Sequence, residues 1–238
     1  MYQRVLLKIS GEQLGGGHHQ LGLDPQVIHY WATECDKVVK AGCKLIIVVG
    51  GGNMVRGAAV AGDGIRRVTA DHMGMLSGVM NAMAMTDIFE SEGVVTRCMS
   101  NFFAPQATES YTYRLAEKHL ERRRVVIIGG GTARPYVTND TAAVNFALEL
   151  GCEVVFKATK VDGVYDKDPT QFDDAQKYDH LDYKTALDNP EIKVMDKTAL
   201  ALAMEFNMPI MVYKAMEPGA LLAAVNKQPV GTFVSANA

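Results

Sequence analysis

Four short segments of the chain combine glycine, hydroxyl and charged residues in a pattern that suits the binding of phosphate groups. They are KISGE from Lys8, GGGNMVRG from Gly50, GGGTARPYVTND from Gly129 and KATKVDGVYDKDP from Lys157. Glycines let backbone N–H groups approach an anion closely, and a following helix adds the positive end of its dipole. Neither glycine turn has the spacing of a GxxxxGKS/T or GxGxxG motif, so the two turns could hold two phosphate-bearing ligands in another way.

Two cationic side chains add to these turns. Lys8 ends the first apolar run, with Ser10 and Gly11 beside it, and Arg56 lies shortly after Gly52. A lysine supplies a point charge for a phosphate, and an arginine can bind one through two hydrogen bonds. Taken singly, each feature is as easily a tight turn or a solvated side chain. Their combination is what predicts a phosphate site.

The segment after Lys157 offers a different chemistry. Tyr165 has an aromatic face that could pack near a base, and Thr159 and Asp168 could line a ribose pocket, with the carboxylate accepting from a sugar hydroxyl. The same residues also form a surface loop with two turns, because of their glycine and proline. From the residues alone, the surface loop is favoured.

Six β-branched runs alternate with helical segments along the chain. They cover residues 5–9, 45–49, 94–99, 125–128, 153–157 and 209–213. This alternation predicts an α/β fold, a three-layer α/β/α sandwich with a mostly parallel central sheet covered on both faces. Ligands of such sheets bind beyond the carboxyl ends of the strands, which is where the four segments lie.

Capping residues mark three of the helices. The Asp24–Pro25 pair suits the start of the first, the second is expected over residues 71–92, and Asn139 or Asp140 is expected to cap the third. Methionines recur through the second helix, and their flexible side chains favour packing in the core or against another subunit over ligand binding.

Composition excludes several classes of function. The 24 Lys and Arg against 27 Asp and Glu give a net charge of -3, and no long basic run indicates a nucleic-acid partner. The four cysteines form no CxxC pair, no histidine pairing suits zinc, and no GxSxG motif is present. No signal peptide or membrane-spanning apolar run is apparent, so we expect a cytoplasmic protein without a membrane partner.

Taken together, the motifs resemble those of the bacterial UMP kinases of the amino acid kinase family. LLKISGE, VGGGNMVRG, DHMGML, GGGTxxPYVTND and KATKVDGVYDKDP occur in this order, followed by KVMDKTA and MPIMVY, so the likeness covers essentially the whole chain. It implies one domain over 1–238, with the acceptor part roughly 1–152 and the ATP part roughly 153–238. It also implies transfer of the γ-phosphoryl group of Mg-ATP to UMP in pyrimidine nucleotide biosynthesis, by a homohexamer.

The resemblance also implies which residues contact each nucleotide. Those expected to bind ATP are Lys8, Ile9, Ser10, Gly11, Gly52, Arg56, Thr159, Tyr165 and Asp168. Those expected to bind UMP are Gly51, Asp71, Thr132, Ala133, Arg134, Pro135, Tyr136, Val137, Thr138 and Asn139. No protein metal site is expected, since Mg²⁺ would arrive bound to the phosphates of ATP.

The expected catalytic residues are Lys8, Arg56, Asp140 and Asp196. Phosphoryl transfer depends mainly on positioning and on charge stabilisation, so Lys8 and Arg56 would clamp the moving group and no dedicated base is needed. Asp140 would orient the cations or cap its helix, and Asp196 would help to position Mg²⁺. Asp71 would accept from the acceptor ribose, cap the second helix, or do both.

The chain departs from the family pattern in the acceptor loop. Ala133 and Arg134 stand where these kinases usually have Gly-Asn, and Asn139 replaces a threonine or serine. The arginine changes the donors facing the base, so the resemblance leaves the strictness of selection for UMP over CMP open. A loop that binds GTP as activator in the family would map near 15–22, where a surface turn is the alternative. Inhibition by UTP is likewise implied by resemblance alone.

Two rival functions follow from the same residues. One is another amino acid kinase, acting on a carboxylate or carbamate, and the other is a non-catalytic relative that binds nucleotide. Asp71 and the TARPYVTND loop favour a nucleotide acceptor over the first rival. The presence of both Lys8 and Arg56 speaks against the second, because a non-catalytic protein has no need of a phosphoryl clamp.

Overall fold

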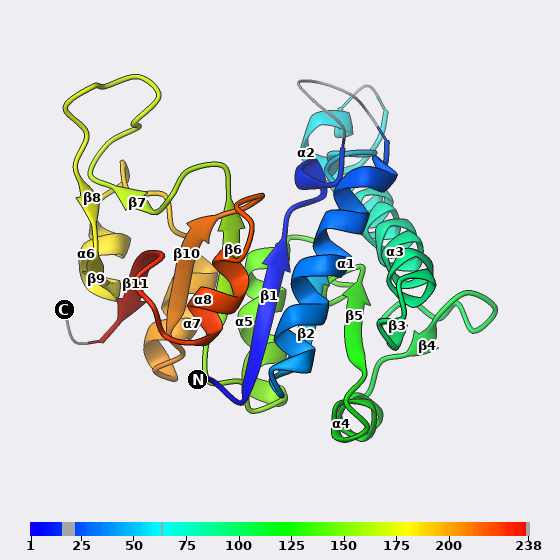
Figure 1. The fold of residues 1–238 in the computed structure, drawn as a ribbon. Coiled ribbons are helices and arrows are strands. Elements are labelled where there is room, and N and C mark those ends of the chain that lie inside the picture. The colour runs from blue at the N-terminus through cyan, green and yellow to red at the C-terminus, as the bar shows by residue number, and fades with distance from the viewer. Residues whose placement is uncertain (16–21, 63, 237–238) are drawn as a thin grey trace.

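A nine-stranded sheet forms the centre of the computed structural model, which describes residues 1–15, 22–62 and 64–236 (Figure 1). The strand order is β4-β3-β5-β2-β1-β6-β10-β11-β9, and neighbours run parallel except for β10 and β11. The strands are β1 Arg4–Ile9, β2 Lys44–Val49, β3 Thr96–Ser100, β4 Glu109–Ser110, β5 Val125–Gly129, β6 Val155–Thr159, β9 His180–Asp182, β10 Ile210–Lys214 and β11 Gly231–Ser235. A separate antiparallel pair joins β7 (Val164–Tyr165) and β8 (Lys177–Tyr178). Each of the six predicted strands is therefore confirmed.

Helices cover both faces of the sheet, as the alternation predicted. The helices are α1 Pro25–Lys40, α2 Gly57–Val60, α3 Arg67–Ser91, α4 Tyr113–Glu121, α5 Asn139–Glu149, α6 Tyr183–Asp188, α7 Lys197–Glu205 and α8 Ala220–Val225. The cores place α4, α5, α6 and α7 on one face, and α1, α3 and α8 on the other. The three-layer α/β/α arrangement is confirmed.

Strand β1 shows how the sheet divides its side chains. Leu6 belongs to the core under α5, whereas Val5 and Leu7 belong to the core under α1. Successive residues of a strand point to opposite faces, so Lys8 shares the α5 face with Leu6. Lys8 stands opposite Lys157 in the register of β1 and β6. The fold thereby places two lysines side by side near the carboxyl ends of two central strands.

Two helix starts differ from the predicted ones. Helix α3 begins at Arg67, after Arg66 in extended conformation, so Asp71 is not its N-cap. An ion pair from Arg67 to Asp71, four residues later, supports this first part of the helix. Helix α5 is capped by Thr138, whose side chain accepts from the backbone N–H of Thr141. The predicted caps at Asn139 and Asp140 are therefore wrong, because the carboxylate of Asp140 has other partners.

Four further expectations from the sequence concern the start of α1, the cysteines, membrane-spanning segments and a regulatory segment. Asp24 caps α1 as predicted, accepting from the backbone N–H of Gln26. All four cysteines are free thiols. No helix in the described residues is long and apolar enough to cross a membrane. The proposed regulatory segment at 15–22 falls mostly on residues 16–21, which lie outside the described residues.

Candidate active site

Three charged side chains meet where β1 and β6 end beside the start of α5. The Nζ atom of Lys8 lies 2.8 Å from Oδ1 of Asp140, and Nζ of Lys157 lies 2.9 Å from Oδ2. The side chains of Lys8, Asp140 and Lys157 are only 11%, 13% and 18% exposed. One carboxylate thus holds two ammonium groups at a fixed separation on the edge where ligands of parallel sheets bind.

Two ammonium groups share one directly paired carboxylate in this cluster, and the carboxylate of Asp196 also acts on Lys157. Burial alone would raise the pKa of Asp140, but Lys157 and Lys8 outweigh it and hold the pKa at about 2. Burial also lowers the pKa of Lys157, against the attraction of Asp140. Two cations sharing one anion in a partly dehydrated site attract a further negative charge. A polyphosphate is well suited to supply it.

Lys157 is the member of this cluster that sequence reasoning missed as a catalytic residue. The sequence places it at the end of the predicted strand 153–157 and at the start of the segment after it, and it lies within β6. Its Nζ also donates to the backbone oxygen of Val194 at 2.7 Å. A charged residue within a strand that is otherwise buried was the available signal.

The turn after β1 packs directly on the glycine turn after β2. A Cβ atom added to Gly11 would lie 2.6 Å from the backbone nitrogen of Gly52, and one added to Gly51 would lie 2.3 Å from the carbonyl oxygen of Gly74 in α3. Real Cβ atoms do not approach backbone so closely, so Gly11 and Gly51 are required for packing whether or not they contact a ligand. Gly52 is less confined, with 3.6 Å to Oε1 of Glu12.

Helix α3 crosses both glycine turns at the same point. A Cβ atom on Gly78 would lie 3.2 Å from the backbone nitrogen of Gly130 and from the carbonyl oxygen of Val49. A Cβ atom on Gly129 would lie 2.7 Å from the carbonyl oxygen of Gly78. The sequence suggested phosphate binding as the reason for the glycines. The structure adds a second reason, the close approach of α3 to the ends of β2 and β5.

Two buried asparagines hold the first glycine turn in place. Asn53 and Asn81 exchange side-chain hydrogen bonds of 3.1 and 2.7 Å, and Nδ2 of Asn81 donates to the carbonyl oxygen of Gly50 at 2.6 Å. Nδ2 of Asn53 also donates to the carbonyl oxygen of Gly22. Sequence reasoning missed this network, although a lone amide in the apolar run of the methionine-rich helix was a signal.

Arg56 lies in a different environment from Lys8. It forms an ion pair with Glu12, and the side chains of Arg56 and Glu12 are 61% and 42% exposed. Among the described residues, no contact joins Arg56 to the cluster around Asp140. The two members of the predicted clamp are therefore not brought into contact, and the role of Arg56 toward ATP stays a prediction.

The acceptor loop after β5 is tied to α3 through Asp71. Its Oδ1 lies 2.6 Å from Nε of Arg67, and its Oδ2 accepts from the backbone N–H of Tyr136 at 2.9 Å. Burial would raise the pKa of Asp71, but these donors keep it below its usual value. The guanidinium of Arg67 also lies 5.4 Å from the centre of the Tyr136 ring. A role of Asp71 toward a ribose stays a prediction.

Asp196 joins the start of α7 to the start of α5. Its Oδ1 accepts from the backbone N–H groups of Thr198 and Ala199, which makes it the N-cap of α7. Its carboxylate also accepts from the hydroxyls of Thr138 and Thr141. Four donors occupy this carboxylate, so the structure gives it a positioning task that the sequence did not suggest. These contacts do not involve a metal ion, so the action of Asp196 on Mg²⁺ stays a prediction.

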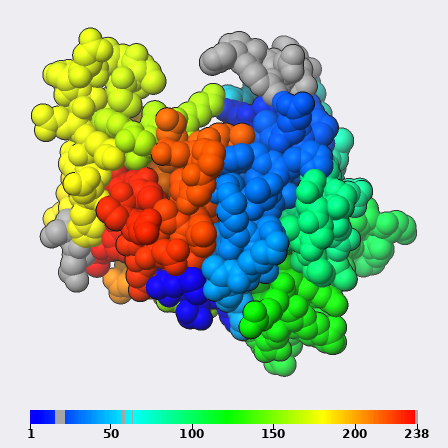
Figure 2. Space-filling view, viewed as in Figure 1, coloured from blue at the N-terminus to red at the C-terminus, as the bar shows by residue number. Residues whose placement is uncertain are grey.

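The three residues expected at the adenosine have local partners. Thr159 donates to the carbonyl oxygen of Val161 at 2.7 Å, and the Tyr165 hydroxyl donates to Asp162 at 2.6 Å. Asp168 accepts from Thr170 and Gln171 within its own loop. These residues lie near the projecting segment around β7 and β8, and Figure 2 shows the upper edge of the molecule hollowed beside it. In the described part of the chain no contact joins the three to one another, so their role stays a prediction.

The remaining residues predicted to bind nucleotide lie at the carboxyl ends of β1 and β5. Ile9 ends β1 and is buried, and the backbone N–H of Ser10 donates to Gln13. The other predicted residues of the acceptor loop are Thr132, Ala133, Arg134, Pro135, Val137 and Asn139. A Cβ atom on Gly131 would lie 2.9 Å from Oδ1 of Asn139, which places this side chain against the second glycine turn.

Comparison with known proteins agrees with this geometry. The sequence model of the amino acid kinase family matches residues 3–214. The chain belongs to the amino acid kinase family. Among solved structures of that family, a UMP kinase from Bacillus anthracis has a TM-score of 0.95 and 33% identity, covering 100% of this chain and 97% of its own. The resemblance inferred from the motifs is thereby confirmed.

Two further structures bear on the family assignment. A UMP kinase from Ureaplasma parvum has a TM-score of 0.91 and 32% identity, covering 99% of both chains. A uridylate kinase from Archaeoglobus fulgidus has a TM-score of 0.75 and 24% identity, covering 98% of this chain and 100% of its own. At that identity the third likeness shows the fold alone.

Proposed function

We propose that this chain is a UMP kinase, which transfers the γ-phosphoryl group of Mg-ATP to UMP and gives UDP and ADP in pyrimidine nucleotide biosynthesis. Two full-length UMP kinase structures above 30% identity support the assignment. The observation that carries it is the buried Lys8–Asp140–Lys157 cluster at the carboxyl ends of β1 and β6. That cluster supplies the fixed positive charge that phosphoryl transfer requires.

The chemistry needs little from the protein beyond this charge. An oxygen of the UMP phosphate attacks the γ-phosphorus, and the bond to the β,γ-bridging oxygen breaks as ADP leaves. The attacking oxygen is already ionised near neutral pH, so no side chain has to remove its proton. Lys8 and Lys157 stabilise the negative charge on the moving group and on the leaving phosphate, and Asp140 keeps both ammonium groups in place.

Magnesium enters this reaction as part of the substrate. Among the described residues, no three His, Cys, Asp or Glu side chains gather in a way that could hold a metal ion. Phosphate oxygens and water would supply most of its ligands when Mg-ATP is bound, as is usual for this ion.

The two lysines come from different parts of the chain. Lys8 belongs to the part assigned to the acceptor, roughly 1–152, and Lys157 to the part assigned to ATP, roughly 153–238. They stand opposite each other in the register of β1 and β6. The reacting phosphates of UMP and ATP would meet above this pair.

A coupled assay of ADP release tests the function. UMP, CMP, glutamate and carbamate are each supplied with Mg-ATP, with and without GTP or UTP as candidate activator and inhibitor. Turnover with UMP is expected, and it should fall roughly 10²-fold to 10³-fold in Lys157→Met. Turnover with glutamate or carbamate alone would instead identify a carboxylate or carbamate kinase. Binding of ATP without release of ADP for any acceptor would identify a non-catalytic relative.

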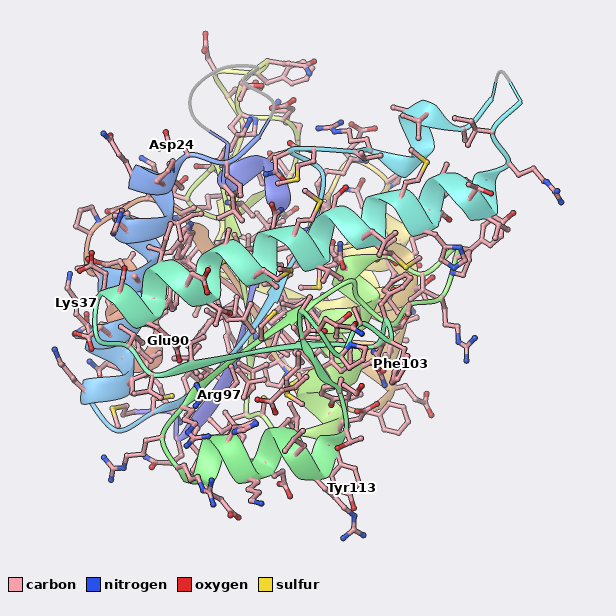
Figure 3. All side chains as sticks on the ribbon, turned by 90° about the vertical axis from the view of Figure 1, so that its right-hand side faces the viewer. Asp24, Lys37, Glu90, Arg97, Phe103 and Tyr113 are labelled. Carbon is pink, nitrogen blue, oxygen red and sulfur yellow. The ribbon has the colours of Figure 1, made fainter. Side chains whose placement is uncertain are left out.

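The outer face of α3 supports self-association, for which a homohexamer is proposed. Met73, Leu76, Met80 and Met83 are exposed there and recur at helical spacing, and Figure 3 shows α3 running across one face of the molecule. Monomeric proteins seldom leave such a stripe in water. Light scattering should show dissociation for Met80→Lys, but not for Met204→Lys at an exposed site on α7.

A further inference from the structure

Consecutive backbone N–H groups in the glycine turn after β2 lack a hydrogen-bond partner. They belong to Gly51, Gly52 and Asn53, and no acceptor within the described residues takes them up. Gly51 and Asn53 are buried, and Gly52 is partly buried. Buried N–H groups are almost always paired in folded proteins, so a run of free ones indicates that an anion completes them.

The direction of the first free donor is set from α3. Nδ2 of Asn81 donates to the carbonyl oxygen of Gly50 at 2.6 Å. The C=O and N–H of a planar trans peptide point in opposite directions. Because the carbonyl of Gly50 faces Asn81, the N–H of Gly51 in the same peptide faces away from it. One side-chain amide therefore fixes how this peptide is turned.

Asn81 is itself held on all sides. Its side chain is fully buried in α3, and its amide exchanges hydrogen bonds of 2.7 and 3.1 Å with the amide of Asn53. Asn53 is anchored in turn to Gly22, by its Nδ2 at 2.8 Å and by its backbone oxygen at 3.0 Å. Both N–H bonds of the Asn81 amide are thus in use, and a buried network of this kind is rigid.

We propose that Asn81 is a positioning residue for phosphoryl transfer, which aims the free N–H groups of the turn at a phosphate by holding the carbonyl of Gly50. The proposal rests on the kinase function proposed above. Asn81 touches no reacting atom and acts through the backbone. Donors that are oriented before the ligand arrives stabilise its charge without reorganisation. Without Asn81 the peptide can turn its oxygen toward the phosphate, which repels it.

A purely structural role of Asn81 predicts a different result. Loss of a buried hydrogen bond lowers the free energy of unfolding wherever it occurs. Such a loss reduces the amount of folded protein but leaves the ligand preference of the folded molecules unchanged. Misdirected donors weaken specifically the binding of the phosphate group. The ratio of the Kd for uridine to the Kd for UMP isolates that group, and Gly51 is expected at the acceptor nucleotide.

The test measures both Kd values by isothermal titration calorimetry, with uridine measured by displacement of UMP. Asn81→Leu fills a similar volume without a donor and should lower the ratio at least 10-fold, about the value of one hydrogen bond to a charged group. Asn81→Ala, which cannot clash, should lower it in the same direction. Asn53→Leu should lower it less, because Asn81 then still donates to Gly50.

Met85→Ala is the matched control. Met85 is fully buried on the same helix, four residues after Asn81, and its truncation should also destabilise the fold. The ratio should nevertheless equal that of the wild type. Urea denaturation shows that each variant is folded and by how much it is destabilised. Should Asn81→Leu not fold, Asn81→Ala decides the question.

The outcomes separate this proposal from the kinase assignment. A wild type that prefers UMP, with the same ratio in the folded Asn81 variants, would overturn the positioning role. An equal fall of the ratio in Met85→Ala would overturn it as well, since general destabilisation would then explain the effect. A wild type that binds UMP no better than uridine and releases no ADP would overturn the kinase assignment instead.

Discussion

Two cation–carboxylate arrangements lie near the carboxyl ends of the central strands, and they differ in almost every physical respect. Lys8 and Lys157 share Asp140 in a site where all three side chains are mostly buried. Arg56 pairs with Glu12, and both of these side chains are largely exposed. Sequence reasoning treated Lys8 and Arg56 as equal partners in one clamp.

The difference in burial determines what each arrangement can contribute to stability and to catalysis. A charge held in a dehydrated site interacts strongly with a ligand and needs no reorganisation when the reaction takes place. An exposed ion pair is screened by water, and its side chains must be ordered each time a ligand binds. We therefore expect the buried cluster to govern both stability and turnover, and the exposed pair to tune binding.

The largest effect is expected from Asp140→Asn. Removing the shared anion leaves Lys8 and Lys157 facing each other in a buried site, which should cost roughly 3–5 kcal/mol of the free energy of unfolding. Urea denaturation measures this loss. Glu12→Gln is the matched control at the exposed pair and should cost no more than about 1 kcal/mol. Equal losses of unfolding free energy in Asp140→Asn and Glu12→Gln would contradict the contrast between the buried cluster and the exposed pair.

Turnover should respond strongly to the lysines of the cluster. Lys8→Met and Lys157→Met each remove one fixed charge while leaving Asp140 paired with the other, so kcat is expected to fall roughly 10²-fold to 10³-fold. The fold should persist, as judged by circular dichroism. A folded Lys157→Met variant with nearly normal kcat would show that this lysine serves structure alone.

Acid should weaken the cluster in a defined range. The pKa of Asp140 is depressed to about 2, so its contribution is fully present above its ordinary pKa near 4 and is lost as pH falls toward 2. At about 1.4 kcal/mol per pKa unit, the loss amounts to about 2 kcal/mol. The stability difference between wild type and Asp140→Asn should shrink over that range. A constant difference from pH 6 to pH 2 would contradict the depressed pKa.

A smaller effect is expected from Asp196. Asp196→Ala removes the N-cap of α7 and the link to Thr138, which should cost roughly 1–2 kcal/mol of stability. Asp196→Asn keeps the cap and should cost less. The Mg²⁺ concentration that gives half-maximal rate should match the wild type in Asp196→Asn, because the carboxylate already has four donors. A marked rise in that concentration would favour the predicted action on Mg²⁺.

The smallest effect on stability is expected from Arg56→Ala, within about 1 kcal/mol. As a prospective ATP contact, Arg56 should act mainly on the KM for ATP, and the loss of kcat should be smaller than in Lys8→Met. Steady-state kinetics at varied ATP measures both constants. A loss of kcat equal to that of Lys8→Met would restore the equal clamp that the motifs predicted.

Much of the fold followed from local patterns, but its contacts did not. The six predicted strands are present, because runs of β-branched residues are visible in any short window. The start of α3 was misplaced, since Arg66 has no capping side chain to mark it. The cap of α5 was predicted at Asn139 or Asp140, whereas Thr138 caps the helix and the side chain of Asp140 pairs with two lysines from distant strands.

The candidate site likewise contains residues that the motifs identified and residues that only the structure revealed. Motifs supplied the glycine turns, Lys8 and Asp140, because their residue types and order are readable in sequence. They did not supply Lys157, whose importance depends on the register between β1 and β6. Nor did they supply the reciprocal amides of Asn53 and Asn81, which meet only when α3 lies across the turn.

The sequence by itself determined the α/β architecture, the family and the residues from which a phosphate site could be built. These properties depend on periodicity and on local backbone preference, which act between residues close together in the chain. Only the tertiary structure decided that Lys157 joins Lys8 at Asp140, and that Arg56 remains exposed. Which side chains are buried and paired depends on which distant segments the sheet brings together. Burial strengthens the interaction of a charge with a ligand, whereas the interaction of an exposed charge is screened by water.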